Sequence, residues 1–504
     1  MLNKTCQTCF RAKIRCVKSQ DSGRCDRCLR LEKPCNFAPR DAPGERPAAV
    51  PVAGPHSECP FARSLVSRSQ ASELVDAFRT KLAPHFPFVV VPSSLNETRP
   101  MLHLAVLSAA SFGDSSLQRR LGALFNQIVG ARVANGPVAT LDMLQGLLVH
   151  LAWAHYQPRP RRHSQHLHLA LSIIADLRMD RPRNPLLWMV EADCRRDRAW
   201  SPDEVRAVAG AYYLASSSSM LLQKSRSFAF APYIAESCRR LAAQSLEDSD
   251  RYLPAIIEAQ RIAECVDSLV DDPAATRAAA LEALNNDFAA LKSSLAFPLS
   301  KSPPLLVLMS MLALLSQSVG SGPFSLAEIR DSNVLAPWLT ERMHAVKLII
   351  NILVTMPAGD EYGVSNIEWI TMYCALSLAA RLDVVAADPS VDATHARRAL
   401  DMPHSLGQVI LRLESASNGI PGDDCDAFSQ LAQRAKRLEA WYLARLERER
   451  PAPSSTGPTD ASPLDWISEL LPGEAGVQPA AWAGDDATSG LGHLGLYSSW
   501  GGPT

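Results

Sequence analysis

The sequence lacks a long apolar segment. Its longest apolar run, residues 305–315, is interrupted by Ser310, whereas about 20 consecutive apolar residues are needed to cross a bilayer. The first residues, MLNKTC, contain nothing like the apolar core of a secretory signal peptide. We therefore expect an intracellular, soluble protein that does not associate with membranes.

The common catalytic motifs are also missing. No HExxH, GxSxG or phosphate-loop pattern occurs. Gly490, Gly492 and Gly495 spell G-x-G-x-x-G, but a dinucleotide site needs a strand before this motif and a helix after it. Cysteines in apolar stretches, such as Cys374, belong more often to a core than to a catalytic site. We therefore expect no enzymatic activity.

Basic residues are absent from the C-terminal segment. Residues 451–504 contain six acidic residues and no Lys or Arg, whereas residues 1–40 contain ten basic and three acidic residues. The overall net charge of −1 thus hides a polarised chain. A basic N-terminus suits a polyanion, and an acidic C-terminus suits a protein partner.

What the sequence does contain is a repeated cysteine pattern. C-x2-C-x6-C occurs twice, and its six members are Cys6, Cys9, Cys16, Cys25, Cys28 and Cys35. Zinc takes four thiolate or imidazole ligands, so six cysteines satisfy two zinc ions only if two sulfurs bridge both ions. The first cysteines of the two halves, Cys6 and Cys25, are the predicted bridges. We expect two Zn²⁺ ions as cofactor, in a reducing compartment.

The two halves, CQTCFRAKIRC and CDRCLRLEKPC, resemble the fungal Zn2Cys6 (binuclear zinc cluster) transcription regulators. The resemblance implies that the helix of the first half enters the major groove of double-stranded DNA over a CGG-like triplet. Lys13 would contact base edges there. Arg11, Arg15 and Lys18 would contact phosphates.

The resemblance also implies a nuclear, sequence-specific regulator of RNA polymerase II genes, and the acidic tail favours an activator. Its targets would be a biosynthetic gene cluster, as in secondary metabolism, or a nutrient pathway. Two alternatives stay open. One is a zinc-containing interaction protein that acts on a DNA-bound partner without reading DNA itself, and the other is a repressor.

Composition divides the chain into four segments. Residues 1–38 form the cluster domain, and the six prolines of residues 39–60 predict an extended linker. Residues 61–450 form a large regulatory domain, and residues 451–504 form the tail. No heptads follow the cluster, so we expect monomeric DNA binding or a homodimer formed through the large domain.

Helical patterns fill the large domain, and no pair of alternating strands is present, so we predict an all-α fold. Residues 140–155 begin with a Thr/Asp start signal and are apolar on nearly every side, which predicts a central core helix. Ser201 followed by Pro202 predicts another helix start. Further helices are predicted at 72–82, 253–270, 274–294, 304–318, 336–355, 365–385, 393–415 and 425–449.

The large domain also resembles the fungal-specific regulatory domain, or middle homology region. The strings that carry this likeness are PHFPFVVVP, LDMLQGLLVHLAWAHYQ, LALSIIADLRMDRPR and GAYYLASSSSMLLQK. The resemblance implies that this domain gates activity and mediates self-association or the response to an effector. His163, His166 and His168 follow a short run of arginines in the sequence. We interpret these histidines as the polar first turns of a helix rather than as a metal site.

The tail mixes acidic residues with large apolar ones, a composition typical of disordered activation segments that bind transcription coactivators. The apolar residues that could share one helical face on binding are Leu464, Trp466, Ile467, Leu470 and Leu471. The alternative is that this segment forms a helix that docks on its own domain.

Overall fold

The computed structural model divides the chain into two units, Met1–His56 and Ser57–Thr504, and we describe each by itself. The described residues of the first unit are 6, 9, 16, 17, 25–31 and 35. Those of the second unit are 62–92, 95, 99–136, 138–156, 162–180, 200–222, 228–269, 274–320, 332–389, 391–417 and 426–448. The predicted linker and tail lie outside the described residues.

The prediction of an all-α fold is confirmed, since the described residues contain helices and no β-strand. The first unit contains α2, Asp26–Arg30. The α-helices of the second unit are α3 (Arg68–Ala77), α5 (Pro100–Ala110), α6 (Ser115–Asn135), α7 (Leu141–Ala152), α8 (His163–Asp176), α9 (Pro202–Leu222), α10 (Pro232–Gln244), α11 (Leu253–Ser268), α12 (Ala274–Ser294), α13 (Pro303–Gly320), α15 (Ser332–Val354), α16 (Asn366–Val385), α17 (Thr394–Leu400), α18 (Met402–Ala416) and α19 (Ala427–Arg448).

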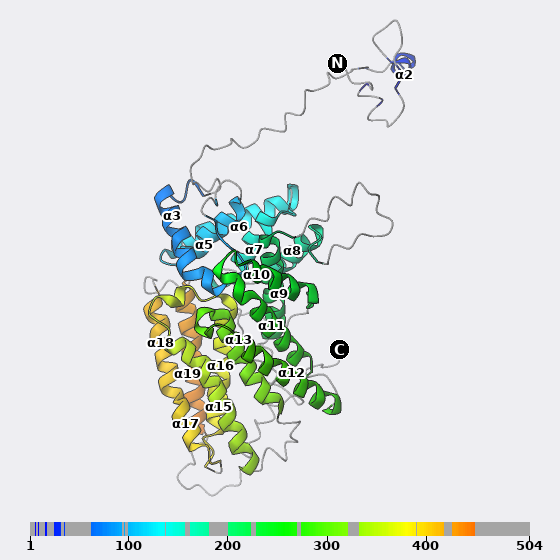
Figure 1. The fold of residues 1–504 in the computed structure, drawn as a ribbon. Coiled ribbons are helices and arrows are strands. Elements are labelled where there is room, and N and C mark those ends of the chain that lie inside the picture. Colours follow the sequence, from blue (N-terminus) through cyan, green and yellow to red (C-terminus); the bar gives the residue numbers. More distant parts are fainter. Residues whose placement is uncertain are drawn as a thin grey trace. The chain divides into compact units, whose positions relative to one another are not determined.

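Short helical segments connect several of these helices. A π-helical turn, Phe78–Leu82, continues α3. The short 3₁₀ segments are Ala83–His85, Ala154–Tyr156, Asp248–Tyr252, Leu299–Lys301 and Asp360–Tyr362. Within the second unit, α3 and α5 to α8 gather at one end, and α15 to α19 run side by side at the other (Figure 1). None of the described helices has both the length and the apolar character needed to span a membrane.

The predicted core helix is α7. Thr140 caps its first turn by accepting a hydrogen bond from the amide of Met143 at 3.2 Å, and every residue from position 143 to 152 is buried. The carboxylate of Asp142 accepts hydrogen bonds from the amides of Met101 and Leu102, at 3.0 and 2.9 Å. The first amides of α5 have no carbonyl partner within their own helix, and a residue of α7 therefore accepts their hydrogen bonds.

The predicted start of α9 is also confirmed. The Ser201 hydroxyl accepts a hydrogen bond from the Glu204 amide at 3.3 Å, and the Glu204 carboxylate accepts one from the Ser201 amide at 2.7 Å. This reciprocal pair is a capping box. It fixes the point at which the chain enters a helix that is buried along most of its length.

The prediction of one helix over residues 393–415 is wrong, because the chain forms α17 and α18 there. Asp401 separates the two helices in a left-handed conformation with φ 44°. Its carboxylate accepts a hydrogen bond from the amide of His404 at 3.3 Å and so caps α18. Pro403 at the second position of α18 fits a new helix start better than a helix interior.

The two ends of the second unit are joined by polar contacts between residues far apart in sequence. The Nε1 of Trp153 donates to the carbonyl of Gly363 at 3.1 Å, and the Nδ1 of His85 lies 3.0 Å from both carboxylate oxygens of Glu368. These groups are buried, so each contact satisfies polar atoms that would otherwise be costly to bury. The contacts therefore fix how the N-terminal helices meet α16.

This junction leads to a prediction about Gly363. A Cβ at position 363 would lie 2.2 Å from the carbonyl oxygen of Lys81, a backbone atom that cannot move aside easily. We expect Gly363→Ala to lower the free energy of unfolding by roughly 1–3 kcal/mol, the usual cost of overpacking, as measured by urea denaturation.

Gly130 supplies the matched control. It is an exposed position inside α6 where an added Cβ would meet nothing within 4 Å. Gly130→Ala should stabilise the protein by roughly 0.5–1 kcal/mol, because alanine is the better helix former. Equal effects of the two substitutions would contradict the close approach at Gly363.

Candidate metal centre

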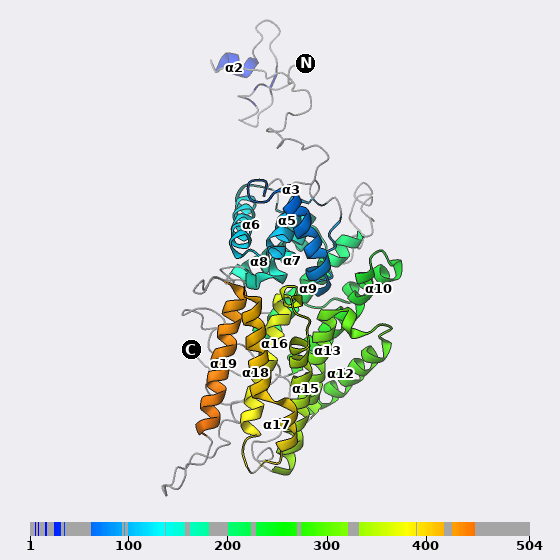
Figure 2. The same cartoon turned by 90° about the vertical axis from the view of Figure 1, so that its left-hand side faces the viewer.

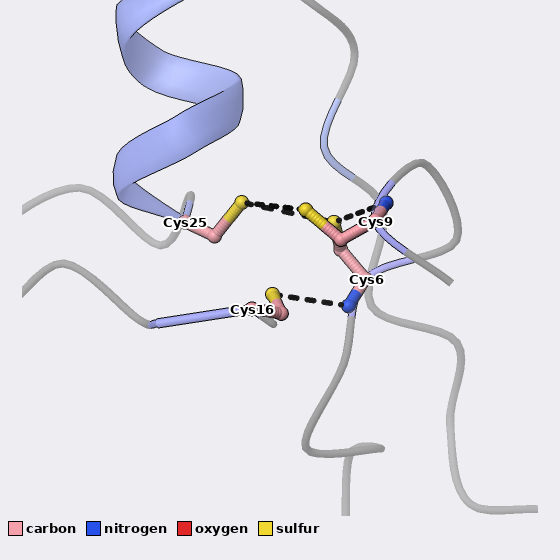
Figure 3. Close-up of side chains that lie close together, drawn as sticks. All are labelled: Cys6, Cys9, Cys16 and Cys25. Carbon is pink, nitrogen blue, oxygen red and sulfur yellow. Dashed lines mark hydrogen bonds between the residues drawn. The ribbon is translucent and has the colours of Figure 1, made fainter. Parts of the chain in front are cut away.

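The six N-terminal cysteines form two overlapping groups of four. One group is Cys6, Cys9, Cys16 and Cys25, and the other is Cys6, Cys25, Cys28 and Cys35. Within each group all sulfur atoms lie within 4.8 Å of one another, and Cys6 and Cys25 belong to both groups. Figure 3 shows the three cysteines of the first half gathered opposite Cys25 of the second half.

The sulfur separations match the size of a zinc site. The Sγ of Cys6 lies 3.7 Å from those of Cys25 and Cys28, and the Sγ of Cys9 lies 3.7 Å from that of Cys25. A tetrahedron with metal–sulfur bonds of about 2.3 Å has edges of about 3.8 Å. A disulfide would instead require about 2.05 Å between sulfurs, and all six cysteines are free. The donor set is therefore compatible with zinc.

The sequence repeat is also a repeat in hydrogen bonding. The amide of Cys9 donates to the Sγ of Cys6 at 3.4 Å, and the equivalent amide of Cys28 donates to Cys25 at 3.4 Å. Likewise Cys6 N–H donates to the Sγ of Cys16 at 3.4 Å, and Cys25 N–H donates to that of Cys35 at 3.2 Å. The described cysteines of the two halves thus make the same amide–sulfur hydrogen bonds, and the first cysteines of the two halves occupy equivalent positions.

The two shared sulfurs differ from the other four in acidity. Burial acts to raise the pKa of Cys25, but the Cys28 amide and neighbouring thiols outweigh it and lower the pKa to about 6. The pKa of Cys6 is also lowered, against the effect of burial, by the Cys9 amide and by neighbouring thiols. Burial raises the pKa of the remaining thiols, which are Cys9, Cys16, Cys28 and Cys35. Metal binds the thiolate form of cysteine, and the amide hydrogen bonds at Cys6 and Cys25 act in favour of that form.

The proposed DNA contacts Lys13, Arg11, Arg15 and Lys18 lie outside the described residues. In the second half, Cys25 caps α2 by accepting from the Cys28 amide. The same short helix exposes Arg30. The apolar segment 464–471 of the tail also lies outside the described residues.

The histidines near residue 163 do not gather into a metal site among the described residues. His168 is exposed, and its Nδ1 lies 2.7 Å from the Ser164 carbonyl. His163 and His166 are buried. The His166 ring meets the His150 ring edge to face, with centroids 5.1 Å apart. The metal-ligand groupings found in the described residues contain only cysteines.

Buried polar pairs in the second unit were not anticipated from the sequence. The carboxylate of Asp250 accepts from Arg206 at 2.7 and 2.8 Å, and that of Glu264 accepts from Tyr212 at 2.7 Å. Asp383 accepts from Tyr442 at 2.7 Å. In each pair the partners are more than 40 residues apart, so no local motif reveals them. We interpret them as fold-specifying contacts between helices.

Comparison with known proteins places the chain in a family. It is 32% identical over 552 aligned residues to transcription factor himD of Aspergillus japonicus, an alignment that covers 96% of this chain and 92% of himD. It is also 26% identical over 228 residues to transcription factor opdL of Penicillium oxalicum (strain 114-2 / CGMCC 5302), covering 36% of this chain and 40% of opdL. No family model matches the chain, and no solved structure matches it.

A helical body in one unit and paired sulfur groups in the other are consistent with a transcription regulator. The chain belongs to the family of fungal transcription factors that includes himD. Proteins of this class are generally not enzymes.

The buried histidines predict a specific acid sensitivity. Burial lowers the pKa of His103 to about 4 and those of His150 and His155 to about 3, with His166 and His163 adding to the effect at His150. These pKa values lie below the ordinary value of 6.5. As the pH falls, these histidines therefore become protonated in the unfolded chain before they do so in the folded chain. The free energy of unfolding is therefore highest above pH 6.5. As the pH falls from 6.5 toward 4, it decreases by roughly 1.4 kcal/mol per histidine and pH unit.

We therefore expect the melting temperature of the helical unit to fall between pH 7.5 and 5.5. His103→Gln should reduce that fall, because one fewer buried imidazole must be protonated. His404→Gln, at an exposed position of α18, is the control and should behave as the wild type. An unchanged pH dependence in His103→Gln would contradict the assignment.

Proposed function

We propose that the six cysteines hold two Zn²⁺ ions, each with four sulfur ligands, and that Cys6 and Cys25 bridge them. The observation that carries this proposal is the membership of these two residues in both sulfur groups. Each half alone supplies three cysteines, one short of a tetrahedral site. If the sulfurs of Cys6 and Cys25 form an edge that both tetrahedra share, each zinc ion has four sulfur ligands and no further ligand is needed.

The metal ions would act structurally, by tying together a unit of few apolar residues. Small domains of this kind gain most of their folding free energy from the metal. Two Zn²⁺ and six thiolates carry a net charge of about −2, which would repel DNA. The ten basic residues within positions 1–40 outnumber that charge and make the unit attractive to phosphates.

Zinc content tests the bridging. Purified protein should contain two zinc ions per chain, as measured by mass spectrometry of metals. Cys6→Ser should lose more zinc than Cys9→Ser, because loss of a bridge removes a bond from each ion. Cys265→Ser, in α11 of the second unit, should retain both ions. One zinc per wild-type chain, or equal losses in both N-terminal variants, would contradict the bridged pair.

We further propose that the first half reads DNA, with Lys13 on base edges of a CGG-like triplet and Arg11, Arg15 and Lys18 on phosphates. A comparison of equivalent positions in the two halves supports the first half, rather than the second, as the one that reads DNA. Lys13 stands seven residues after Cys6, and the residue seven after Cys25 is Glu32. A carboxylate cannot donate to guanine O6 and N7, so the second half is unsuited to the same contact.

Gel-shift measurements on CGG-containing and unrelated duplexes test this assignment. Lys13→Ala should weaken binding to the specific duplex by roughly 1–3 kcal/mol and affect the unrelated duplex less. Lys18→Ala should weaken both and reduce the salt dependence by about one counterion. Glu32→Ala, at the equivalent position of the second half, should not weaken specific binding. Equal losses from Lys13→Ala and Lys18→Ala would remove the special role of Lys13.

The alternative is a zinc-containing interaction protein that acts on a DNA-bound partner. Selection from random duplexes distinguishes the two functions. A protein that reads DNA enriches one sequence, whereas an interaction protein enriches none.

In this proposal the chain is a nuclear regulator of RNA polymerase II genes, and the two relatives named transcription factors support that role. Residues 1–38 form the DNA-binding domain, residues 61–450 form a regulatory body that can also form a homodimer, and residues 451–504 recruit coactivators. A biosynthetic gene cluster or a nutrient pathway is the proposed target. A repressor differs only in what the tail binds.

A further inference from the structure

One charged side chain of the first unit contacts the sulfur cluster. Arg27 lies on α2 (Figure 2), two residues after Cys25. It is partly buried, whereas the other charged residues of α2, Asp26 and Arg30, are exposed. The side chain of Arg27 donates a hydrogen bond to the sulfur of Cys9. A residue of the second half therefore contacts a proposed zinc ligand of the first half.

The position of Cys9 explains why this contact forms. The Cys9 side chain is fully buried, and its Sγ lies 3.7 Å from that of Cys25, the residue that directly precedes α2. Burial and the thiols of Cys6 and Cys25 raise the pKa of Cys9, and the hydrogen bond from Arg27 acts in the opposite direction. A buried charge is costly unless a partner compensates it. A guanidinium group, which stays protonated in proteins, can compensate a thiolate at this position.

The two halves differ in the residue that makes this contact. Arg27 directly precedes the second cysteine of its half, and the equivalent residue of the first half is Thr8, which carries no charge. In the second half the cysteine equivalent to Cys9 is Cys28, and burial together with neighbouring thiols raises its pKa. The position that could give Cys28 the same positive partner thus holds an uncharged residue.

This difference bears on one sulfur group more than on the other. Cys9 belongs only to the first group, and Cys28 belongs only to the second. Residues that hydrogen-bond a metal ligand fix the orientation of that ligand, and hydrogen bonds between charged partners are the stronger ones. A contact between Arg27 and Cys9 therefore acts on the first group directly.

We propose that Arg27 is a positioning residue of the metal centre, which holds the Cys9 thiolate and strengthens the binding of the zinc ion in the first sulfur group. The inference rests on the proposed pair of bridged zinc ions. The same contact ties the half that carries Lys13, the proposed base-reading residue, to the helix of the other half. It also offsets part of the negative charge of the cluster.

Graded competition for zinc tests the proposal on the full-length chain. A chelator, EDTA, is added in steps to zinc-loaded protein, the freed thiols are alkylated with N-ethylmaleimide, and the alkylated cysteines are identified by mass spectrometry. Cys9 and Cys16 belong only to the first sulfur group, and Cys28 and Cys35 belong only to the second. We call these the first pair and the second pair. Each pair reports on the release of one zinc ion.

Arg27→Met removes the guanidinium group but keeps a long side chain of similar helix propensity. We expect the first pair to become alkylated at an EDTA concentration that is roughly 10- to 100-fold lower than in the wild type, the usual effect of losing a residue that supports a metal ligand. The second pair should shift less, because its own sulfurs keep their contacts.

Two further variants separate the contact from the loss of charge. Arg30→Met removes the same charge from an exposed position of the same helix, and it is the matched control that should behave as the wild type. Arg27→Lys should recover part of the protection of the first pair, because an ammonium group also carries a positive charge and donates hydrogen bonds.

Two results would overturn the proposal. One is an equal shift of both pairs in Arg27→Met, which would mean that Arg27 stabilises the unit as a whole. The other is a first pair that shifts no more in Arg27→Met than in Arg30→Met. A wild-type chain that holds a single zinc ion would instead contradict the proposed pair of ions. In that case the order of alkylation in Arg27→Met would still decide whether Arg27 protects Cys9.

Discussion

The zinc cluster that we propose depends on one constraint, which is that six sulfur atoms complete two tetrahedra only if two of the sulfurs are shared. The structure meets it by placing Cys6 and Cys25 in both four-sulfur groups. Equivalent amides from the two halves point at equivalent sulfurs, so the repeat in the sequence becomes a repeat in space. Among the described residues of this unit, the buried core consists of cysteines, and the base-reading residue that we propose, Lys13, belongs to the same unit.

The second unit depends on a different kind of interaction. Its helices bury an extensive apolar core, and a small number of polar contacts decide how they meet. Asp142 of α7 caps α5, and His85 reaches Glu368 of α16. Such contacts favour one arrangement over other ways of packing similar apolar helices.

Local signals in the sequence predict local structure well here. The cap at Thr140 and the capping box at Ser201 locate the starts of α7 and α9, because both use contacts within one helical turn. The break at Asp401 was missed although Asp401 and Pro403 are themselves start signals, since the apolar periodicity continues through them. The contact between His85 and Glu368 spans 283 positions. No local pattern can predict a contact of that kind, because it depends on how whole helices pack. The cysteine spacing predicts the ligand count, and the 3.7 Å sulfur separations come only from the fold.

Zinc K-edge X-ray absorption on the full-length protein tests the shared sulfurs most directly. The account predicts a first shell of four sulfurs at about 2.3 Å around each zinc, together with a second-shell signal from a neighbouring zinc ion. Nitrogen or oxygen in the first shell, or no zinc neighbour in a sample that carries two ions per chain, would contradict it. Either result would mean that Cys6 and Cys25 do not join two metal ions into one cluster.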